Sequence, residues 1–152
     1  MNEAGQIPEF GEKDPAANYE LRPGGYAVVR RDGGEMLTVS TPKGIYLPGG
    51  AQEEGETLEA AAVREAEEEC GLCIRIEESI GTADELSWSE SDRKHYRKRG
   101  TFFTAIVVGT GESSESDHKV LWLKPQEAVR QLGEQSQIWA VENTNSRFFE
   151  GE

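Results

Sequence analysis

The chain has 152 residues and a formal net charge of −13 at pH 7, a length that suits one domain with a buried core. The acidic balance argues against sequence-independent binding to nucleic acid or to an anionic membrane. No apolar run approaches the ~18 residues of a membrane span, and residues 1–13 contain no apolar secretory core. We therefore expect a cytoplasmic protein, monomer or homodimer, with no nucleic-acid or membrane partner.

We expect residues 1–18, which are rich in Gly, Pro and Glu, to form a flexible arm. One domain is expected over residues 19–152. Apolar alternation between Gly, Pro and Asp turn signals predicts strands. The expected strands are Gly25–Arg31, Glu35–Thr41, Gly44–Leu47, Cys73–Ala83, Thr101–Val108 and Val120–Leu123. Residues 84–100 are polar and are expected to form a long connection or strand ends, and residues 109–118 an acidic, Ser-rich loop.

Three helices are expected between and after these strands. The first begins after Thr57, a suitable N-cap, and ends before Gly71 at the position where a left-handed residue stops a helix. Pro125 opens the second at its first position. The last is expected over Ser136–Phe148, with Trp139 packed in the core. Strands mixed with helices in this way predict an α/β sandwich.

Four glutamates crowd the carboxyl end of the first expected helix. They are Glu65, Glu67, Glu68 and Glu69. Acids there oppose the helix macrodipole, and like charges four residues apart repel. At about 100° per residue, Glu65 and Glu69 project with Leu58 and Ala62, which should face inward. Because isolated buried charge is costly, a bound divalent cation accounts for the cluster; a solvated acidic helix face is the alternative.

These glutamates belong to a longer pattern with fixed spacing, G-x5-E-x7-R-E-U-x-E-E-x-G-U, where U is a bulky aliphatic residue. The matching residues are Gly50, Glu56, Arg64, Glu65, Glu68, Glu69, Gly71 and Leu72, and Ala66 is smaller than the pattern prefers. With this box, the chain resembles the Nudix (MutT-like) hydrolase family, of which the preceding Leu47-Pro48-Gly49-Gly50 is also typical. The resemblance implies a Nudix-type α/β/α sandwich with a mixed β-sheet.

The resemblance also implies a cofactor and a set of catalytic residues. Mg²⁺, for which Mn²⁺ can substitute, would be held by Glu65, Glu68 and Glu69. The glutamate at the position of Glu68 or Glu69 would orient or deprotonate the attacking water. Arg64 would hold a carboxylate in place, with Glu56 as the expected partner.

Residues around the box complete the expected site. Gly50 and Gly71 shape the loops on either side of the helix. The family often uses one more acid on a loop near a later strand, and Glu115 is our choice over Glu112 and Asp117. An acidic loop without catalytic function is the alternative.

A basic cluster stands out in this acidic chain. It comprises Arg93, Lys94, His95, Arg97, Lys98 and Arg99, with Tyr96 among them and Trp88 before them. We expect Arg97 and Arg99 to bind substrate phosphates, while a solvated hairpin is the alternative. Arg22 and Tyr26 are also expected to bind substrate, since the first strand borders the pocket in relatives.

The function expected from the resemblance is Mg²⁺-dependent hydrolysis of a nucleoside diphosphate linked to another moiety. The leading substrates are (deoxy)nucleoside triphosphates, including oxidised ones, because the accessory patterns of other subfamilies are absent from the sequence. Diadenosine polyphosphates and nucleotide sugars are alternatives. A regulatory Nudix domain without activity is an alternative from another class. Such domains usually lose box glutamates, whereas this chain keeps all of them. A carbon–carbon isomerase on the same fold would need a pocket cysteine.

The two cysteines, Cys70 and Cys73, form a lone C-x-x-C. A zinc site needs two more ligands, and the histidines, His95 and His118, are unpaired and distant in the sequence. Redox motifs of this spacing open a helix, whereas this one closes a helix. We therefore expect neither a zinc nor a redox function for the pair.

Overall fold

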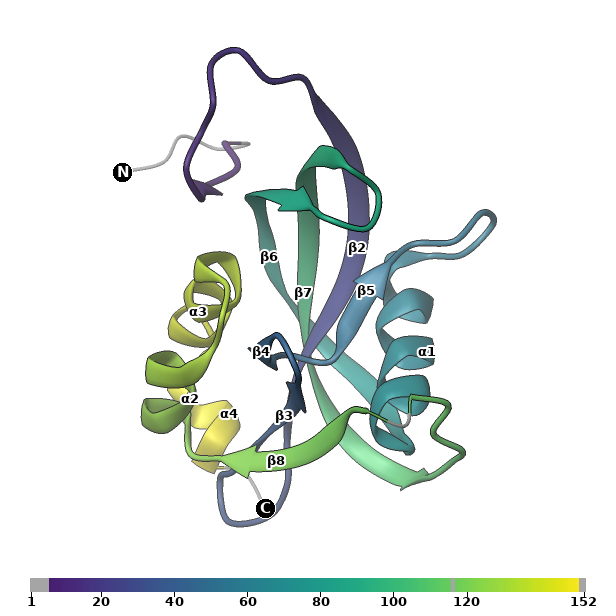
Figure 1. Ribbon diagram of the computed structural model, residues 1–152. Helices are drawn as coiled ribbons and strands as arrows, with labels where there is room; N and C mark the ends of the chain where they lie inside the picture. Colours follow the sequence, from purple (N-terminus) through teal and green to yellow (C-terminus); the bar gives the residue numbers. More distant parts are fainter. Residues whose placement is uncertain (1–5, 116, 151–152) are drawn as a thin grey trace.

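The computed structural model describes residues 6–115 and 117–150, and within them eight strands form one mixed sheet with helices on both faces (Figure 1). The strands are β1 (Glu9–Phe10), β2 (Tyr19–Arg30), β3 (Met36–Thr41), β4 (Gly44–Tyr46), β5 (Gly49–Ala51), β6 (Leu72–Ser89), β7 (Lys94–Thr110) and β8 (Lys119–Leu123). The helices are α1 (Leu58–Cys70), α2 (Pro125–Gln131), α3 (Gln135–Glu142) and α4 (Ser146–Glu150). The expected α/β fold with a mixed sheet is confirmed.

The strand order places the first long strand at the centre of the sheet. The order is β1-β6-β7-β2-β3-β4, with β5 also paired to β2 and β8 to β3. The pairs β1–β6 and β2–β7 are parallel, and the other pairs are antiparallel. Helix α1 lies on one side of the sheet, and α2, α3 and α4 lie on the other (Figure 1).

Successive residues of the central strands supply two separate cores. On β2, Ala27 and Val29 belong to the cluster that includes the buried alanines of α1, whereas Val28 belongs to the cluster that includes α2 and α3. On β7, Phe103 belongs to the cluster on the α1 side and Phe102 to the cluster on the side of α2 and α3. This follows from the two-residue period of a strand. Both faces of the sheet are therefore anchored, which fixes α1 against β2.

The sheet extends further than the sequence predicts. Residues 84–100, expected as a long connection or strand ends, belong mostly to β6 and β7, which pair continuously as far as Ser89 and Lys94. Strand β2 likewise begins at Tyr19 and pairs with β7 from His95 onward. The reason is that part of this extension is exposed on both faces, so polar residues occur at both odd and even positions and mask the strand alternation.

The two chain ends also differ from expectation. Residues 1–5 of the expected flexible arm and residues 151–152 of the expected domain lie outside the described residues, but Glu9 and Phe10 form β1 against β6. The expected last helix is two helices, because α3 ends at Glu142 with Asn143 as its C-cap, and the Asn145 side chain accepts a hydrogen bond from the Arg147 amide at 2.9 Å. Asn side chains compete with the helix for backbone groups in this way. Among the described helices, none has the length and apolarity to cross a bilayer.

Gly25 allows α1 to approach the sheet closely. A Cβ atom at Gly25 would lie 2.0 Å from the carbonyl oxygen of Leu58, the first residue of α1. We expect Gly25→Ala to lower the free energy of unfolding by roughly 3 kcal/mol, because backbone must move to make room. Urea unfolding measures this. Gly109→Ala is the matched control, since its Cβ would meet only the Cys73 Cβ at 3.9 Å; an equal loss in both variants would contradict the packing argument.

Candidate active site

Helix α1 is set between two caps that the sequence predicted. The Thr57 hydroxyl accepts a hydrogen bond from the Ala60 amide at 3.0 Å. Gly71 follows the last turn with φ 70°, and its amide donates to the Glu67 carbonyl at 2.8 Å. Ala66, small where the box pattern prefers a bulky residue, is fully buried. The caps thus fix which glutamates of the last turn face the sheet.

Arg64 joins the loop before α1 to the glutamates of its last turns. Its guanidinium donates two hydrogen bonds to the Glu56 carboxylate, at 2.7 and 3.1 Å, and one to the Ala51 carbonyl at 3.0 Å. It also donates to Glu65 and Glu68, each at 3.2 Å. These hydrogen bonds hold the pKa of Glu56 below its ordinary value. Arg64 therefore positions carboxylates, as expected from the box.

Glu65 and Glu69 turn toward the body of the protein. Glu69 accepts a hydrogen bond from the Gly49 amide at 3.0 Å, and its burial, together with the nearby charge of Glu65, raises its pKa to about 8. Burial also raises the pKa of Glu65. A Cβ at Gly50 would lie 2.5 Å from a Glu65 carboxylate oxygen, so a side chain at this position would displace the Glu65 carboxylate. The apolar face of the helix thus carries two poorly solvated carboxylates.

The acidic loop between β7 and β8 lies against the end of α1. The amides of Ser114 and Glu115 donate to the Glu68 carbonyl, at 2.9 and 3.2 Å. The Glu115 charge contributes to the raised pKa of both Glu65 and Glu69. The structure therefore brings Glu115 into the electrostatic neighbourhood of the box glutamates, and its catalytic role stays a prediction.

The donor set fits a hydrated divalent cation better than a closed metal cage. Within residues 6–115 and 117–150, no three acidic, His or Cys side chains already converge on a point that could hold a metal. Mg²⁺, however, binds proteins through one or two carboxylates and keeps several waters or substrate phosphates. The raised pKa values of Glu65 and Glu69 show carboxylates that repel one another and lack full solvation. A cation beside them would relieve both costs.

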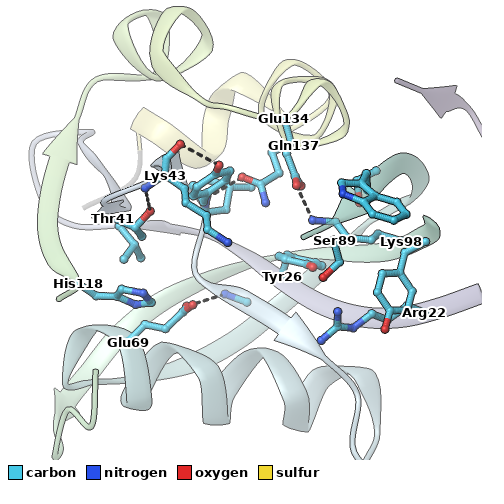
Figure 2. A pocket seen from close by; sticks show the side chains of 17 residues that line it. Arg22, Tyr26, Thr41, Lys43, Glu69, Ser89, Lys98, His118, Glu134 and Gln137 are labelled. Atoms are coloured by element: carbon cyan, nitrogen blue, oxygen red, sulfur yellow. Dashed lines mark hydrogen bonds and ion pairs between the residues drawn. The ribbon is translucent and has the colours of Figure 1, made fainter. Parts of the chain in front are cut away.

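A cavity of about 410 Å³ opens beside Glu69, between the sheet, α3 and the β3–β4 turn (Figure 2). Its volume lies in the usual range for small-molecule sites. The lining residues are Arg22, Tyr26, Val39, Thr41, Lys43, Tyr46, Leu47, Gly49, Glu69, Ser87, Trp88, Ser89, Tyr96, Lys98, His118, Glu134 and Gln137. The pocket thus unites Glu69 of the box with Arg22 and Tyr26, which were expected to bind substrate.

Part of the pocket wall is fixed by internal contacts. Tyr26 stacks on Phe102 with ring centroids 5.4 Å apart, and burial raises its pKa, so the phenol stays neutral. Gln137 accepts a hydrogen bond from the Leu47 amide at 2.8 Å. Lys98 is ion-paired with Glu134. The contacts of Gln137 and Glu134 connect the strands to α3.

Several lining residues were missed by sequence reasoning. They are Lys43, Tyr46, His118, Glu134 and Gln137. They come from the β3–β4 turn and β4, the segment before β8, and the start of α3, three places far apart in the chain. No local pattern links these segments, because their meeting depends on the pairing of β8 with β3 and on the packing of α3.

The structure places Arg97 and Arg99 away from the residues that line the pocket. Arg97 pairs with Glu9 at 2.7 Å and with Asp84 at 3.0 Å, and Arg99 pairs with Asp84 at 2.9 Å. Asp84 is 2% exposed. Successive residues of β7 face opposite sides of the sheet, so these arginines share a face with each other and not with Lys98. In this structure they neutralise a buried carboxylate and connect β1, β6 and β7.

This placement predicts a structural effect of the arginines. We expect Arg97→Ala with Arg99→Ala to lower the free energy of unfolding by roughly 3 kcal/mol, because the buried Asp84 carboxylate loses both partners. Chemical denaturation measures the loss, with Arg75→Ala, at a side chain 63% exposed, as control. A raised KM with unchanged stability would instead support the phosphate-binding role expected from the sequence.

The cysteines lie at the end of α1 and the start of β6 as free thiols. Burial raises the pKa of Cys70 to about 12, so its thiolate is disfavoured at neutral pH. Neither cysteine lines the pocket described above.

The comparison with known families bears directly on this geometry. A model of the NUDIX domain matches residues 20–142. The chain belongs to the Nudix hydrolase family. The matched region contains the box helix and the strands that line the pocket.

One curated relative of this Nudix chain is Nudix hydrolase 21, chloroplastic, from Arabidopsis thaliana, which is 36% identical over 75 residues. The match covers 46% of this chain and 35% of the relative, so the chain spans about a third of that protein.

Solved structures of Nudix proteins share the fold at low sequence identity. A NUDIX hydrolase from Nitrosomonas europaea matches with a TM-score of 0.67 and 20% identity, covering 82% of this chain and 88% of that one. The E. coli dihydroneopterin triphosphate pyrophosphohydrolase matches with a TM-score of 0.63 and 21% identity, covering 83% and 96%. A MutT NUDIX hydrolase from Burkholderia pseudomallei matches with a TM-score of 0.59 and 24% identity, covering 83% and 99%.

Proposed function

We propose that this Nudix chain is a Mg²⁺-dependent pyrophosphohydrolase that cleaves a nucleoside diphosphate linked to another moiety. The leading substrates are (deoxy)nucleoside triphosphates, including oxidised ones. The observation that carries the proposal is that Glu69 of the box lies in a pocket of about 410 Å³ together with the cationic side chains of Arg22 and Lys43. A phosphoanhydride needs both an acidic metal site and positive charge along its phosphates.

The box residues suit the required proton chemistry. Hydrolysis joins a water oxygen to phosphorus, breaks the P–O bond of the bridging oxygen and releases the water proton. Glu69, whose pKa is raised to about 8 by burial, and Glu68 are the candidates to accept that proton, with Glu115 as a further acid nearby. Arg64 holds Glu65 and Glu68 in place. The cation, when bound by Glu65, Glu68 and Glu69, supplies charge neutralisation and a more acidic water.

The substrate-binding proposal follows the pocket. Arg22 lies with its guanidinium carbon 4.9 Å from the Tyr96 ring centroid, within the pocket lining. Tyr26 forms part of the floor beside Glu69, as Figure 2 shows. The E. coli neighbour named for a triphosphate substrate is in keeping with a triphosphate here. Arg97 and Arg99 do not line the pocket and are ion-paired with Asp84. We therefore assign them only a long-range electrostatic effect on the substrate.

The test is a substrate panel with Mg²⁺ and with Mn²⁺, read out as released phosphate or pyrophosphate. The panel contains nucleoside triphosphates, an oxidised triphosphate, a diadenosine polyphosphate and a nucleotide sugar. We expect turnover of a triphosphate that excess EDTA abolishes. Full turnover in EDTA would refute the metal assignment, and binding without turnover of any member would favour a regulatory domain.

The proposal also concerns the localisation, oligomeric state and partners of the enzyme. We propose a cytoplasmic monomer or homodimer whose partner is the small-molecule substrate, with no nucleic-acid or membrane partner. The net charge of −13 supports this, since it disfavours binding to polyanions.

A further inference from the structure

We propose that Lys43 and His118 form an anion subsite that binds a phosphate group of the substrate in the same pocket as Glu69. The subsite deepens the proposed function and rests on it for the identity of the substrate. Both residues line the cavity that contains Glu69. In Figure 2, His118 lies beside Glu69, and Lys43 reaches over the cavity from the β3–β4 turn.

The turn that carries Lys43 is held by its own hydrogen bonds. The Lys43 amide donates to the Thr41 hydroxyl at 3.1 Å, and that hydroxyl donates to the Gly44 carbonyl at 3.0 Å. The Tyr46 hydroxyl donates to the Lys43 carbonyl at 3.3 Å. The backbone beneath Lys43 is therefore fixed at both ends of the turn, and the ammonium group moves only through its own side chain.

The positive charge of Lys43 is not neutralised by the protein. Within the described part of the chain, no carboxylate lies within ion-pair distance of Lys43, whereas Lys98 of the same pocket is paired with Glu134. In an acidic protein, a cation left unpaired at a pocket rim is available to an anionic ligand. Lys43 thus differs from Lys98 in what it can offer a phosphate.

His118 supplies a second donor to the subsite, beside Glu69. Its Nδ1 atom is buried, and the described residues give it no hydrogen-bond partner, while Nε2 lies 3.7 Å from the Asp117 carboxylate. The pairing of Ser40 with Lys119 places His118 next to the end of β3 and so beside Thr41. A buried polar atom normally has a partner. Because the His118 ring lines the cavity, a rotation of the ring would turn this nitrogen toward a bound phosphate oxygen.

The two side chains suit a phosphate oxyanion. A lysine ammonium binds phosphate as a point charge, and an imidazole nitrogen can donate one N–H bond. Glu69, where the proposed cation binds, lies beside His118, and Lys43 reaches over the same cavity. A phosphate bound there would contact both the cation and the nitrogen donors, which holds the phosphoanhydride near Glu69.

The test measures binding of pyrophosphate with Mg²⁺ by calorimetry, so that it does not depend on turnover. We expect Lys43→Gln and His118→Asn each to weaken binding about tenfold, on the scale of one charge-assisted hydrogen bond. Lys119→Gln removes the same charge from the neighbouring exposed position and should bind as the wild type does. Steady-state kinetics on the best panel substrate should show the loss in KM rather than kcat.

The outcomes separate the subsite from the proposed reaction. Lys43→Gln binding pyrophosphate as tightly as the wild type overturns the subsite, as does a wild type that does not bind pyrophosphate. If the wild type binds pyrophosphate through Lys43 but hydrolyses no member of the panel, the proposed reaction fails and the subsite stands. Melting temperatures of all variants distinguish loss of binding from loss of folding.

Discussion

Glu69→Gln is expected to lower kcat by roughly 10²-fold or more while the protein stays folded, on the scale of losing a metal ligand or general base. The substitution keeps the shape of the side chain and its capacity to accept the Gly49 hydrogen bond, but removes the charge. Steady-state kinetics under saturating Mg²⁺ measure the effect. Glu59→Gln, at an exposed position in the first turn of the same helix, is the matched control and should retain activity.

The same substitution should change the pH dependence of stability. In the metal-free protein the pKa of Glu69 is raised from 4.5 to about 8, so the folded state holds a proton that the unfolded state releases. This contribution to stability is fully present below about pH 4.5 and is lost as pH rises through about 8. Glu69→Gln removes it.

The melting temperature of metal-free Glu69→Gln should therefore exceed that of the wild type most clearly above pH 8. Thermal unfolding in EDTA across this range checks the prediction. Unchanged kcat together with a lower melting temperature would show that Glu69 acts only in the structure.

Arg64→Lys should raise the Mg²⁺ concentration needed for half-maximal activity by roughly 10–100-fold, the usual cost of losing a residue that orients metal ligands. A lysine cannot reproduce the paired hydrogen bonds to Glu56 while also reaching Ala51, Glu65 and Glu68. The melting temperature should fall as well, because the loop before α1 loses its attachment to the helix.

A Mg²⁺ titration of activity measures the change. Arg31→Lys is the control, since Arg31 also pairs with a glutamate, Glu35, but is 46% exposed and remote from the box. Equal metal dependence in Arg64→Lys and wild type would contradict the positioning role and leave Arg64 as a purely structural residue.

The box helix could be predicted in detail because its signals are local. Thr57 and Gly71 cap it at predictable positions, and the helical period alone places Glu65 and Glu69 on the inward face. The resemblance to the Nudix box implied that Arg64 and Glu56 are partners. In each case the contact depends on residues close in sequence.

The pocket could be predicted only in part, because its wall depends on distant pairing. Lys43 and His118 are brought together by β8 lying against β3, which no single segment encodes. Arg97 and Arg99 were expected to bind phosphate because they belong to a basic cluster in an acidic chain, but the register of β6 and β7 places Asp84 directly opposite Arg99. Charge in a sequence shows what a residue can bind, but the register of the sheet decides which partner it meets.

The attachment of the acidic loop to the Glu68 carbonyl makes two backbone amides sensitive to events at the box. Ser114 and Glu115 follow the box by more than forty positions, yet both donate to one oxygen in the last turn of α1. Any displacement of that turn changes the electronic environment of both protons at once. Their paired resonances in an amide spectrum would act as a built-in reporter of site occupancy, readable without a label on the substrate.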